Sequence, residues 1–319
     1  MVRPGLPRRR GRAGRLRPAA ARVRAWYSPL YRVRAGSEGF PTEKFALTAR
    51  LLSAEGALGP AGLVEPDLPP ATELLRAHTP DWVGKAVSGG LSAAEEAALA
   101  LKWSPELSVA HRLCARGTLE ACRDALRGGL GLHVGGGSHH AFAARGEGYC
   151  LLNDLAIALL VLKAEGKVAR AAVVDLDVHQ GNGTASILAG REGLITFSMH
   201  QEDLYPERKE ASTRDIGLPA GTGDAKYLKI LEEELTAFLA RRPELVVYQA
   251  GVDVWEGDLL GGLSLTPEGV AARDRLVFRL CRQRGVPVAV TLGGGYAEDL
   301  GDVAALHART LTTGIEVFK

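Results

Sequence analysis

The sequence predicts a single α/β domain whose central, mostly parallel sheet carries helices on both faces. From about residue 130 onward, short apolar and partly β-branched segments alternate with longer helical segments. Short apolar runs are typical of strands buried in parallel sheets, and βα alternation builds such sheets. With 319 residues, of which 46% are hydrophobic, the chain can bury a large core. The alternation favours one continuous domain over two.

The N-terminal part is predicted to contain one strand and three helices. The strand covers 26–31, and the helices cover 40–53, 74–87 and 105–130. Pro29 turns the strand, Pro80 interrupts the second helix and Ser104 caps the third.

The C-terminal part is predicted to alternate strands with helices. The strands are 132–134, 171–177, 194–200, 244–250 and 287–292, and the helices are 153–165, 224–241, 267–284 and 301–312. Gly166 ends the first of these helices, and Pro267 suits the first turn of the third.

The segment RAAVVDLDVHQGNGTA organises the predicted site. Its buried strand is followed by Asp175, Asp177 and His179 at alternate positions, which project to one side while the backbone stays extended. Such groups at the end of a buried strand are costly unless a cation or hydrogen-bond donors meet them. We therefore interpret Asp177 and His179 as two ligands of a divalent metal ion, and the glycines that follow as a turn.

Every unusual polar cluster follows a predicted strand. These residues are His139 and His140, the group 175–179, Ser198 and His200, Asp253, and Tyr296. In a parallel sheet the carboxyl ends of the strands share one edge, so we expect these side chains to meet in one crevice.

Asp253 is the predicted third metal ligand, with a turn cap after Gly251 as the alternative. Two carboxylates and one imidazole leave a coordination position open for water, whereas structural zinc sites have four protein ligands. The oxygen-rich set also suits Fe²⁺ or Co²⁺, which leaves the physiological metal open.

His139 and His140 are candidates for the acid and base of such a site, with exposed loop histidines as the alternative. Imidazole titrates in the useful range, and Asp175 is suited to orient one of the two rings. Tyr296, after three glycines, is either a packed aromatic or a phenol donor to a developing oxyanion.

Residues 1–24 contain nine arginines and no acidic residue, although the whole chain carries a net charge of only +2. This composition favours a disordered tail, or sequence translated upstream of the real start. A nucleic-acid arm and a transit peptide are the alternatives. Because the remainder, 25–319, is acidic, nucleic-acid binding by the folded part is not expected.

The four cysteines are scattered without a CxxC pair, which favours a reducing compartment and a cytoplasmic location. No run of about 18 apolar residues exists, so no membrane span is predicted.

Five ordered blocks resemble the signature motifs of the histone deacetylase superfamily. They are GGGSHHA (135–141), GYCLLND (148–154), DLDVHQGNG (175–183), YQAGVD (248–253) and LGGGY (292–296). The resemblance spans about residue 26 to the C-terminus. HQGNG, EGDLLGGLSLT (256–266) and FPTEKF (40–45) resemble the class IV, deacetylase-eleven-like branch and its bacterial relatives.

The resemblance implies an arginase/deacetylase-like fold and zinc-dependent hydrolysis of an N-acyl-lysine or similar amide. By the matched motifs, zinc is bound by Asp177, His179 and Asp253, and Tyr296 polarises the acyl carbonyl. The resemblance makes His140 the general base and later acid, with His139 as its electrostatic partner. Asp175 supports His139, and Asn182 lies where many relatives have an Asp behind the second histidine.

The resemblance also implies a substrate tunnel and a potassium site. Gly148, Tyr149 and Leu260 would line the acyl-lysine tunnel. The monovalent cation would be bound by Asp175, Asp177, His179, Ser198 and Met199, several through backbone carbonyls.

Two residues depart from the family pattern. Tyr149 replaces the usual Phe and adds a hydroxyl to a mostly apolar tunnel wall, which weakens an expected preference for long fatty acyl chains. Asn182 is neutral, so it should raise the pKa of His140 less than an Asp would. We therefore expect His140 to be largely neutral at about pH 7.

Three other functions are considered from the sequence. An acetylpolyamine deacetylase would use the same metal and base, because these groups do not contact what lies beyond the amide nitrogen. An arginase-like dimetal hydrolase is disfavoured because its additional aspartate-rich motif is missing. An inactive protein that binds acyl ligands is disfavoured by the complete set of ligands, base pair and tyrosine.

Overall fold

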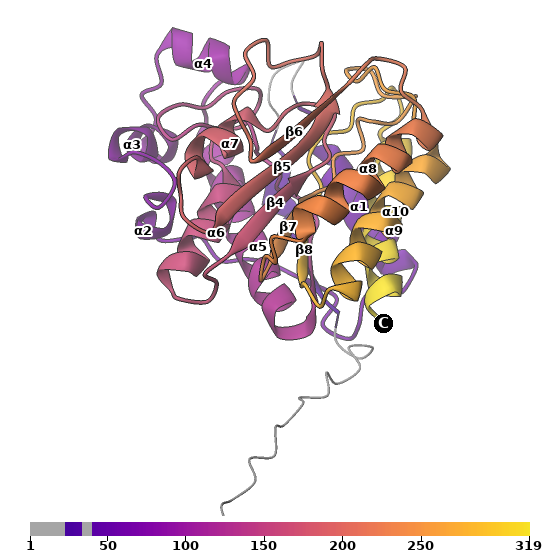
Figure 1. The fold of residues 1–319 in the computed structure, drawn as a ribbon. Coiled ribbons are helices and arrows are strands. Elements are labelled where there is room, and N and C mark those ends of the chain that lie inside the picture. The colour runs from indigo at the N-terminus through magenta and orange to yellow at the C-terminus, as the bar shows by residue number, and fades with distance from the viewer. Residues whose placement is uncertain (1–22, 34–39) are drawn as a thin grey trace, which may run out of the picture.

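The computed structural model describes residues 23–33 and 40–319. The predicted tail at 1–24 therefore lies almost entirely outside the described residues. The rest forms a central sheet with helices packed on both sides (Figure 1).

Eight strands form one sheet in the described part of the chain, in the order β2-β1-β3-β8-β7-β4-β5-β6. The strands are β1 Ala25–Trp26, β2 Leu63–Val64, β3 Leu130–His133, β4 Ala171–Asp175, β5 Leu194–Gln201, β6 Arg214–Leu218, β7 Val246–Gln249 and β8 Val288–Thr291. All neighbouring strands run parallel, which confirms the predicted sheet type.

The helices connect successive strands and cover the sheet. They are α1 Glu43–Ala54, α2 Ala71–Leu74, α3 Pro80–Ser88, α4 Ala93–Leu99, α5 Pro105–Gly128, α6 Asp154–Ala164, α7 Asn182–Leu188, α8 Asp224–Leu239, α9 Pro267–Gln283 and α10 Leu300–Phe318. Ser104 caps α5 as predicted, because its hydroxyl accepts a 3.1 Å hydrogen bond from the backbone N–H of Leu107.

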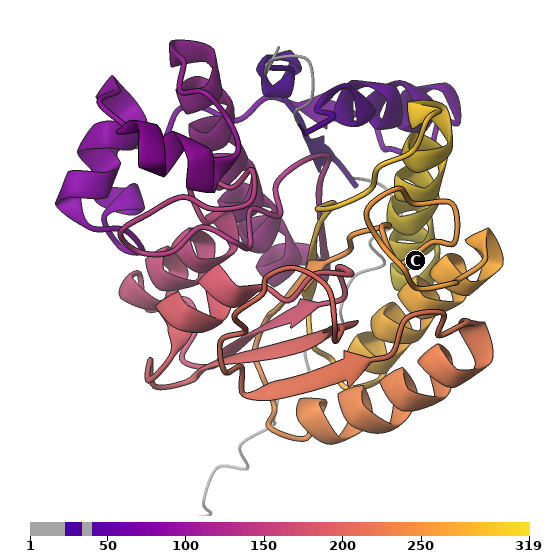
Figure 2. The same cartoon turned by 90° about the horizontal axis from the view of Figure 1, so that it is seen from above.

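The sheet separates two apolar cores. Successive side chains of a strand point to opposite faces, and β4 follows this rule. Ala171 and Val173 pack with α5 and α6 on one face, whereas Ala172 and Val174 pack with α1, α8, α9 and α10 on the other. Figure 2 shows helices on both sides of the sheet. Burial on both faces explains why the strands read as continuous apolar runs.

Several predicted elements differ from the structure. Within 26–31, only Trp26 belongs to a strand, and Pro29–Tyr31 form a short 3-10 helix. The proposed helix at 74–87 is wrong at its start, because Pro80 begins α3 and the Thr79 hydroxyl caps it.

Other elements were not predicted at all. The strands β2 and β6 and the short helices α2, α4 and α7 are absent from the prediction. The strand β6 has a mostly half-buried or exposed pattern, as expected of a strand at the sheet edge, so it lacks the apolar signal of the central strands. The helix α7 replaces the turn expected after Gly181.

The strand β4 ends at Asp175, not at 177. Asp177 and His179 therefore extend from the loop that follows β4, and their positions depend on contacts with other loops rather than on strand geometry. This loop lies at the carboxyl edge of the sheet, beside the loops that follow β3, β7 and β8.

Candidate functional site

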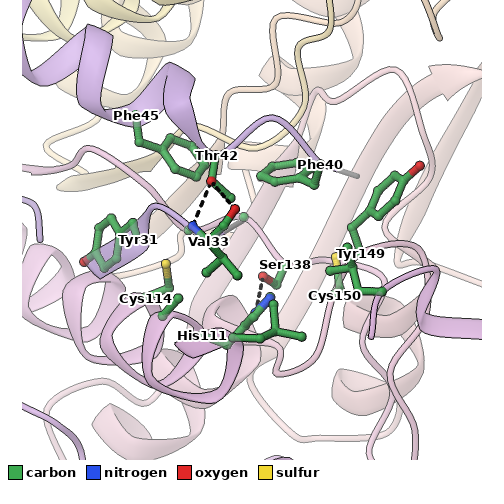
Figure 3. Close-up of a pocket in the computed structure, with 15 residues that line it drawn as sticks. Tyr31, Val33, Phe40, Thr42, Phe45, His111, Cys114, Ser138, Tyr149 and Cys150 are labelled. Atoms are coloured by element: carbon green, nitrogen blue, oxygen red, sulfur yellow. Dashed lines mark hydrogen bonds between the residues drawn. The ribbon is translucent and has the colours of Figure 1, made fainter. Parts of the chain in front are cut away.

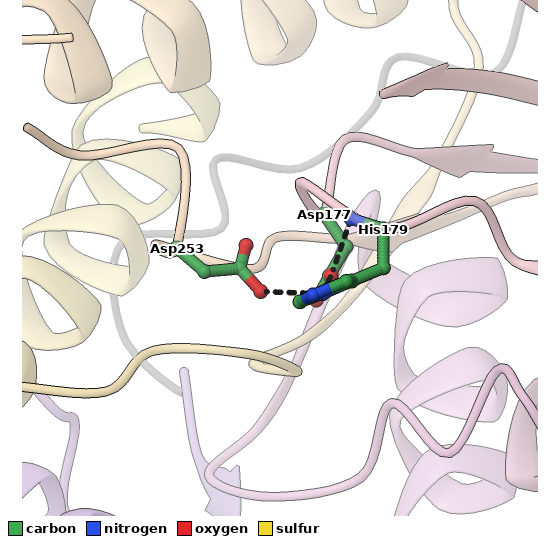
Figure 4. A group of neighbouring side chains, drawn as sticks. All are labelled: Asp177, His179 and Asp253. Carbon is green, nitrogen blue, oxygen red and sulfur yellow. Dashed lines mark hydrogen bonds and ion pairs between the residues drawn. The ribbon is translucent and has the colours of Figure 1, made fainter. Parts of the chain in front are cut away.

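Asp177, His179 and Asp253 form a compact group at this edge (Figure 4). Each offers a ligand atom, and these atoms lie within 4.8 Å of one another. Nδ1 of His179 is 3.1 Å from Oδ1 of Asp177 and 3.4 Å from Oδ2 of Asp253. Both aspartates are buried. The structure thus brings the three predicted ligands together from the loops after β4 and β7.

Backbone donors orient the two carboxylates. Asp177 Oδ2 accepts a hydrogen bond from the N–H of Gly294 at 2.8 Å, and Asp253 Oδ1 accepts one from the N–H of Val178 at 2.9 Å. Asp253 Oδ2 is buried and makes no hydrogen bond of good geometry, and Nδ1 of His179 lies 3.4 Å from it. A buried carboxylate oxygen left in this state is costly unless a cation meets it. The donor set therefore fits a divalent metal ion with an open coordination position.

The charges of this group shift its pKa values strongly. Burial, together with the charge of Asp177, raises the pKa of Asp253 to about 7. Burial lowers the pKa of His179, but the two carboxylates outweigh this effect and raise it to about 10. Protons and a metal ion must therefore compete for the same atoms.

His139 and His140 stand side by side, with ring centroids 4.0 Å apart. His139 Nδ1 is 2.7 Å from Oδ2 of Asp175, and His140 Nδ1 is 2.7 Å from Oδ1 of Asn182. Each ring thus has its own polar partner. The predicted pairing of Asp175 with His139 and of Asn182 with His140 matches these contacts.

The two imidazoles have opposite electrostatic environments. Burial lowers the pKa of His139, but Asp175 and Asp177 outweigh it and raise the pKa to about 9. Burial and the neighbouring charges of His139 and His179 lower the pKa of His140 well below its ordinary value. His139 therefore holds a proton, whereas the adjacent His140 is free to accept one.

A cleft of about 440 Å³ opens over these groups. Its lining includes His139, His140, Asp177, His179 and Tyr296. The cleft is also lined by the predicted tunnel residues Gly148, Tyr149 and Leu260. The predicted metal ligands, histidine pair and tyrosine therefore face one cavity or lie directly behind it.

The loop that carries Tyr296 is held by Lys44 of α1, a residue that sequence reasoning did not assign to the site. Lys44 is fully buried, and its Nζ donates to the carbonyls of Gly293 at 2.7 Å and Gly295 at 3.2 Å. Its ammonium also lies 5.1 Å from the centroid of the Tyr296 ring. The lysine between Glu43 and Phe45 in the FPTEKF segment carries no sequence signal that marks it as buried.

A second, smaller cavity of about 50 Å³ shares part of the cleft wall (Figure 3). Phe40, Gly137, Tyr149 and Cys150 line both cavities. Its lining comes mainly from residues 31–33 and 40–45, from α5 and from the loop after β3.

Of the predicted potassium residues, Asp175 lies on β4 and Ser198 and Met199 lie on the adjacent strand β5, whereas Asp177 and His179 lie in the loop after β4. Asp175 and Ser198 are direct partners in the parallel register, and Met199 is the next residue along β5. The Ser198 hydroxyl lies 2.9 Å from Nδ1 of His200. The strand register therefore places Asp175 beside Ser198, next to the loop that carries Asp177 and His179.

A model of the histone deacetylase domain matches residues 40–311. The chain belongs to the histone deacetylase family.

Individual relatives agree with this assignment. An uncharacterized protein of Picosynechococcus sp. is 41% identical over 84% of this chain and 90% of its own length. Histone deacetylase 2 of Arabidopsis thaliana is 29% identical over 83% of this chain and 71% of its own length. Acetoin utilization protein AcuC of Bacillus subtilis is 28% identical over 84% of this chain and 76% of its own length.

The fold agrees as well. The crystal structure of the HDA15 HD domain superposes with a TM-score of 0.73 at 23% identity, and the match covers 93% of this chain and 90% of that one. The histone deacetylase fold predicted from the motifs is therefore confirmed.

In this histone deacetylase domain, four residues near the site had no predicted role. They are Lys44, Glu147, Tyr205 and Arg273. Glu147 and Tyr205 resemble ordinary surface residues in the sequence, and Arg273 lies in a helix rich in arginine. Only their partners, which are distant in the chain, set them apart.

Proposed function

We propose that this chain is a zinc-dependent deacylase that hydrolyses the amide of N-acetyl-lysine or a related N-acyl amine. Members of the histone deacetylase family are hydrolases that act on amide bonds, and the family match covers most of the chain. The observation that carries the proposal is the convergence of the Asp177, His179 and Asp253 ligand atoms within 4.8 Å, beside a paired histidine.

A zinc ion bound by Asp177, His179 and Asp253 would supply a Lewis acid that activates water and polarises the acyl carbonyl. Fe²⁺ is the alternative ion for this oxygen-rich set. Potassium at the group formed by Asp175, Ser198 and the adjacent backbone is proposed as a second, structural cation.

The side chains of the domain then move the protons. His140 accepts the proton of the attacking water and later returns it to the leaving amine, since its low pKa keeps it free of a proton beforehand. His139, held by Asp175, retains its proton and stabilises negative charge nearby. Tyr296 donates its phenol hydrogen to the developing oxyanion.

The acyl-lysine side chain is proposed to enter through the cleft lined by Gly148, Tyr149 and Leu260. Leu260 and its neighbour Leu259 are exposed at this side of the molecule, which suits an apolar substrate stem.

The class IV branch and the cytoplasmic location stay predictions. The four buried, free cysteines support the cytoplasmic location. Among the described helices, none is both long and apolar enough to cross a membrane.

The proposal is tested by turnover assays on acetyl-lysine peptides, acetylpolyamines and myristoyl-lysine peptides, each with and without a chelator. We expect release of acetate from the peptide and its loss on chelation. Preferential turnover of the polyamine would replace acetyl-lysine by a small-molecule substrate. Binding of the peptide by metal-replete protein without acetate release would refute the hydrolase proposal.

A further inference from the structure

The amide of Asn182 is held on both sides. Its Oδ1 lies 2.7 Å from Nδ1 of His140 and accepts a 2.9 Å hydrogen bond from the N–H of Gly183. Its Nδ2 donates to Oε1 of Glu147 at 2.9 Å. A chain of side chains thus runs from the histidine through a neutral amide to a carboxylate.

The Glu147 carboxylate is itself held in place. Oε2 accepts from Nε of Arg145 at 3.1 Å, and Oε1 accepts from the Tyr205 hydroxyl at 3.1 Å. The backbone of Glu147 exchanges two hydrogen bonds with that of Cys150, at 3.1 and 2.9 Å. Between them, Gly148 adopts φ +53° and Tyr149 φ +67°. This closed turn keeps the carboxylate beside Asn182.

Tyr205 connects the same carboxylate to the cleft. Its ring packs edge-on against His140, with centroids 4.9 Å apart, and it is 41% exposed. The phenol therefore bonds Glu147 at one end of the network while the ring covers the histidine at the other.

An asparagine amide can present either its oxygen or its NH₂ group to a neighbour. Only the oxygen can accept a hydrogen bond from Nδ1–H of His140. A carboxylate only accepts hydrogen bonds and a backbone N–H only donates, so Glu147 at the NH₂ end and Gly183 at the oxygen end together turn the oxygen of Asn182 toward the histidine. His140 then carries its hydrogen on Nδ1, and Nε2 keeps the lone pair that a general base requires.

We propose that Glu147 is a positioning residue that fixes the Asn182 amide and thereby the tautomer of His140. The inference rests on the proposed function of His140 as a base. An aspartate at position 182 would accept from Nδ1–H in either orientation, so the need for Glu147 is specific to the asparagine that this chain has there.

The experiment compares five proteins: the parent, Glu147→Ala, Glu147→Gln, Asn182→Asp, and Asn182→Asp combined with Glu147→Ala. We expect Glu147→Ala to lower kcat about 10-fold with KM within about 2-fold of the parent, because a hydrogen bond to a charged group is lost. Glu147→Gln should retain more activity, since its amide oxygen can still accept. The double variant should recover kcat relative to Glu147→Ala.

A spectroscopic readout needs no turnover. Long-range ¹⁵N–¹H NMR of the imidazoles in metal-free protein reports which nitrogen of His140 carries the hydrogen. We expect the Nδ1–H form in the parent and an increased Nε2–H form in Glu147→Ala. Glu234→Gln is the matched control, because Glu234 also pairs with an arginine, Arg214, but lies on α8.

An unchanged tautomer together with parent kcat in Glu147→Ala would overturn the proposal, as would an equal loss of kcat in the Asn182→Asp background. If Glu147→Ala does not fold, Glu147→Gln carries both measurements, and parent values for kcat and tautomer in that variant would count against the role. A parent protein without amidase activity would refute the proposed function, while the NMR comparison still decides the role of Glu147.

Discussion

The chemistry of the site depends on how individual titratable groups differ from one another. Asp253 and His179 have raised pKa values, about 7 and about 10, whereas the pKa of His140 lies well below its ordinary value. Asp253 and His179 therefore bind protons at the atoms that would ligate a metal ion, whereas His140 is free to accept a proton. The division follows from burial and from which side chains carry neighbouring charge.

Metal binding should release protons, and its affinity should rise with pH. Below pH 7, both Asp253 and His179 hold a proton in the metal-free protein, and each must lose it to become a ligand. We expect the zinc affinity to increase from pH 6.5 to 8.5, as measured by calorimetry in buffers with different ionisation enthalpies. Asp253→Asn should bind zinc more weakly and release fewer protons. An affinity that does not change over this range would contradict the ligand assignment.

Tyr296→Phe should lower turnover much more than substrate binding. The phenol is proposed to donate to charge that develops only in the transition state, and removal of such a donor costs on the order of 10²–10³ in kcat. KM should stay within a few-fold of the parent value. Tyr27→Phe, which removes a phenol away from the cleft, serves as the control in steady-state assays. Equal kcat in Tyr296→Phe and the parent would dismiss the role.

At the scale of elements, helices hold the loops that carry the site. Lys44 of α1 bonds the glycine turn before Tyr296. Arg273 of α9 is fully buried, and its Nη1 donates to the carbonyls of Leu176 at 3.2 Å and Gly251 at 2.6 Å. These carbonyls precede Asp177 and Asp253, respectively, so one guanidinium connects the two loops that supply the metal ligands.

Arg273→Lys should weaken metal binding even where the protein folds. A lysine keeps the charge beside Asp274, whose carboxylate is 2.8 Å from Nη2 of Arg273, but it lacks the planar fork that reaches two carbonyls. We expect about a 10-fold loss of zinc affinity and a lower Tm. Arg309→Lys, on the exposed side of α10, is the matched control for an arginine paired with a glutamate. Parent-level zinc affinity in folded Arg273→Lys would show that the two loops do not need this residue.

At the scale of the whole molecule, the parallel sheet assembles the site. The ligands follow β4 and β7, the histidine pair follows β3 and Tyr296 follows β8. These strands are neighbours in the order β3-β8-β7-β4, so segments more than 100 residues apart meet at one edge. A metal ion bound there would connect the loop after β4 with the loop after β7.

Removing the metal should therefore destabilise the protein as well as stop turnover. A ligand that binds only the folded state stabilises it by about 2.7 kcal/mol at a concentration 100 times its Kd. We expect a lower Tm after chelation, with recovery of both Tm and activity when zinc is returned, measured by thermal melting and acetate release. The His179→Ala variant should show no change of Tm with zinc. A parent Tm insensitive to zinc would argue against a bound metal at these loops.

The sequence alone determined the sheet type, the main strands and the groups that follow them. Buried strands such as β4 and β7 are local apolar runs, so they can be recognised without knowledge of their partners. The motifs around His140, His179 and Asp253 predicted the family, which the comparisons confirm. The start of α4 also has a local signal in the sequence that the prediction does not include. This signal is the capping box formed by Ser92 and Glu95.

Only the tertiary structure decided which distant side chains support the site. Glu147 and Arg273 are charged residues that a sequence pattern assigns to the surface, yet one contacts Asn182 and the other is fully buried against two loops. Their roles depend on hydrogen bonds to residues 22 to 97 positions away. Hydrophobic periodicity reports which face of an element is buried, but packing between elements determines which polar atoms meet there.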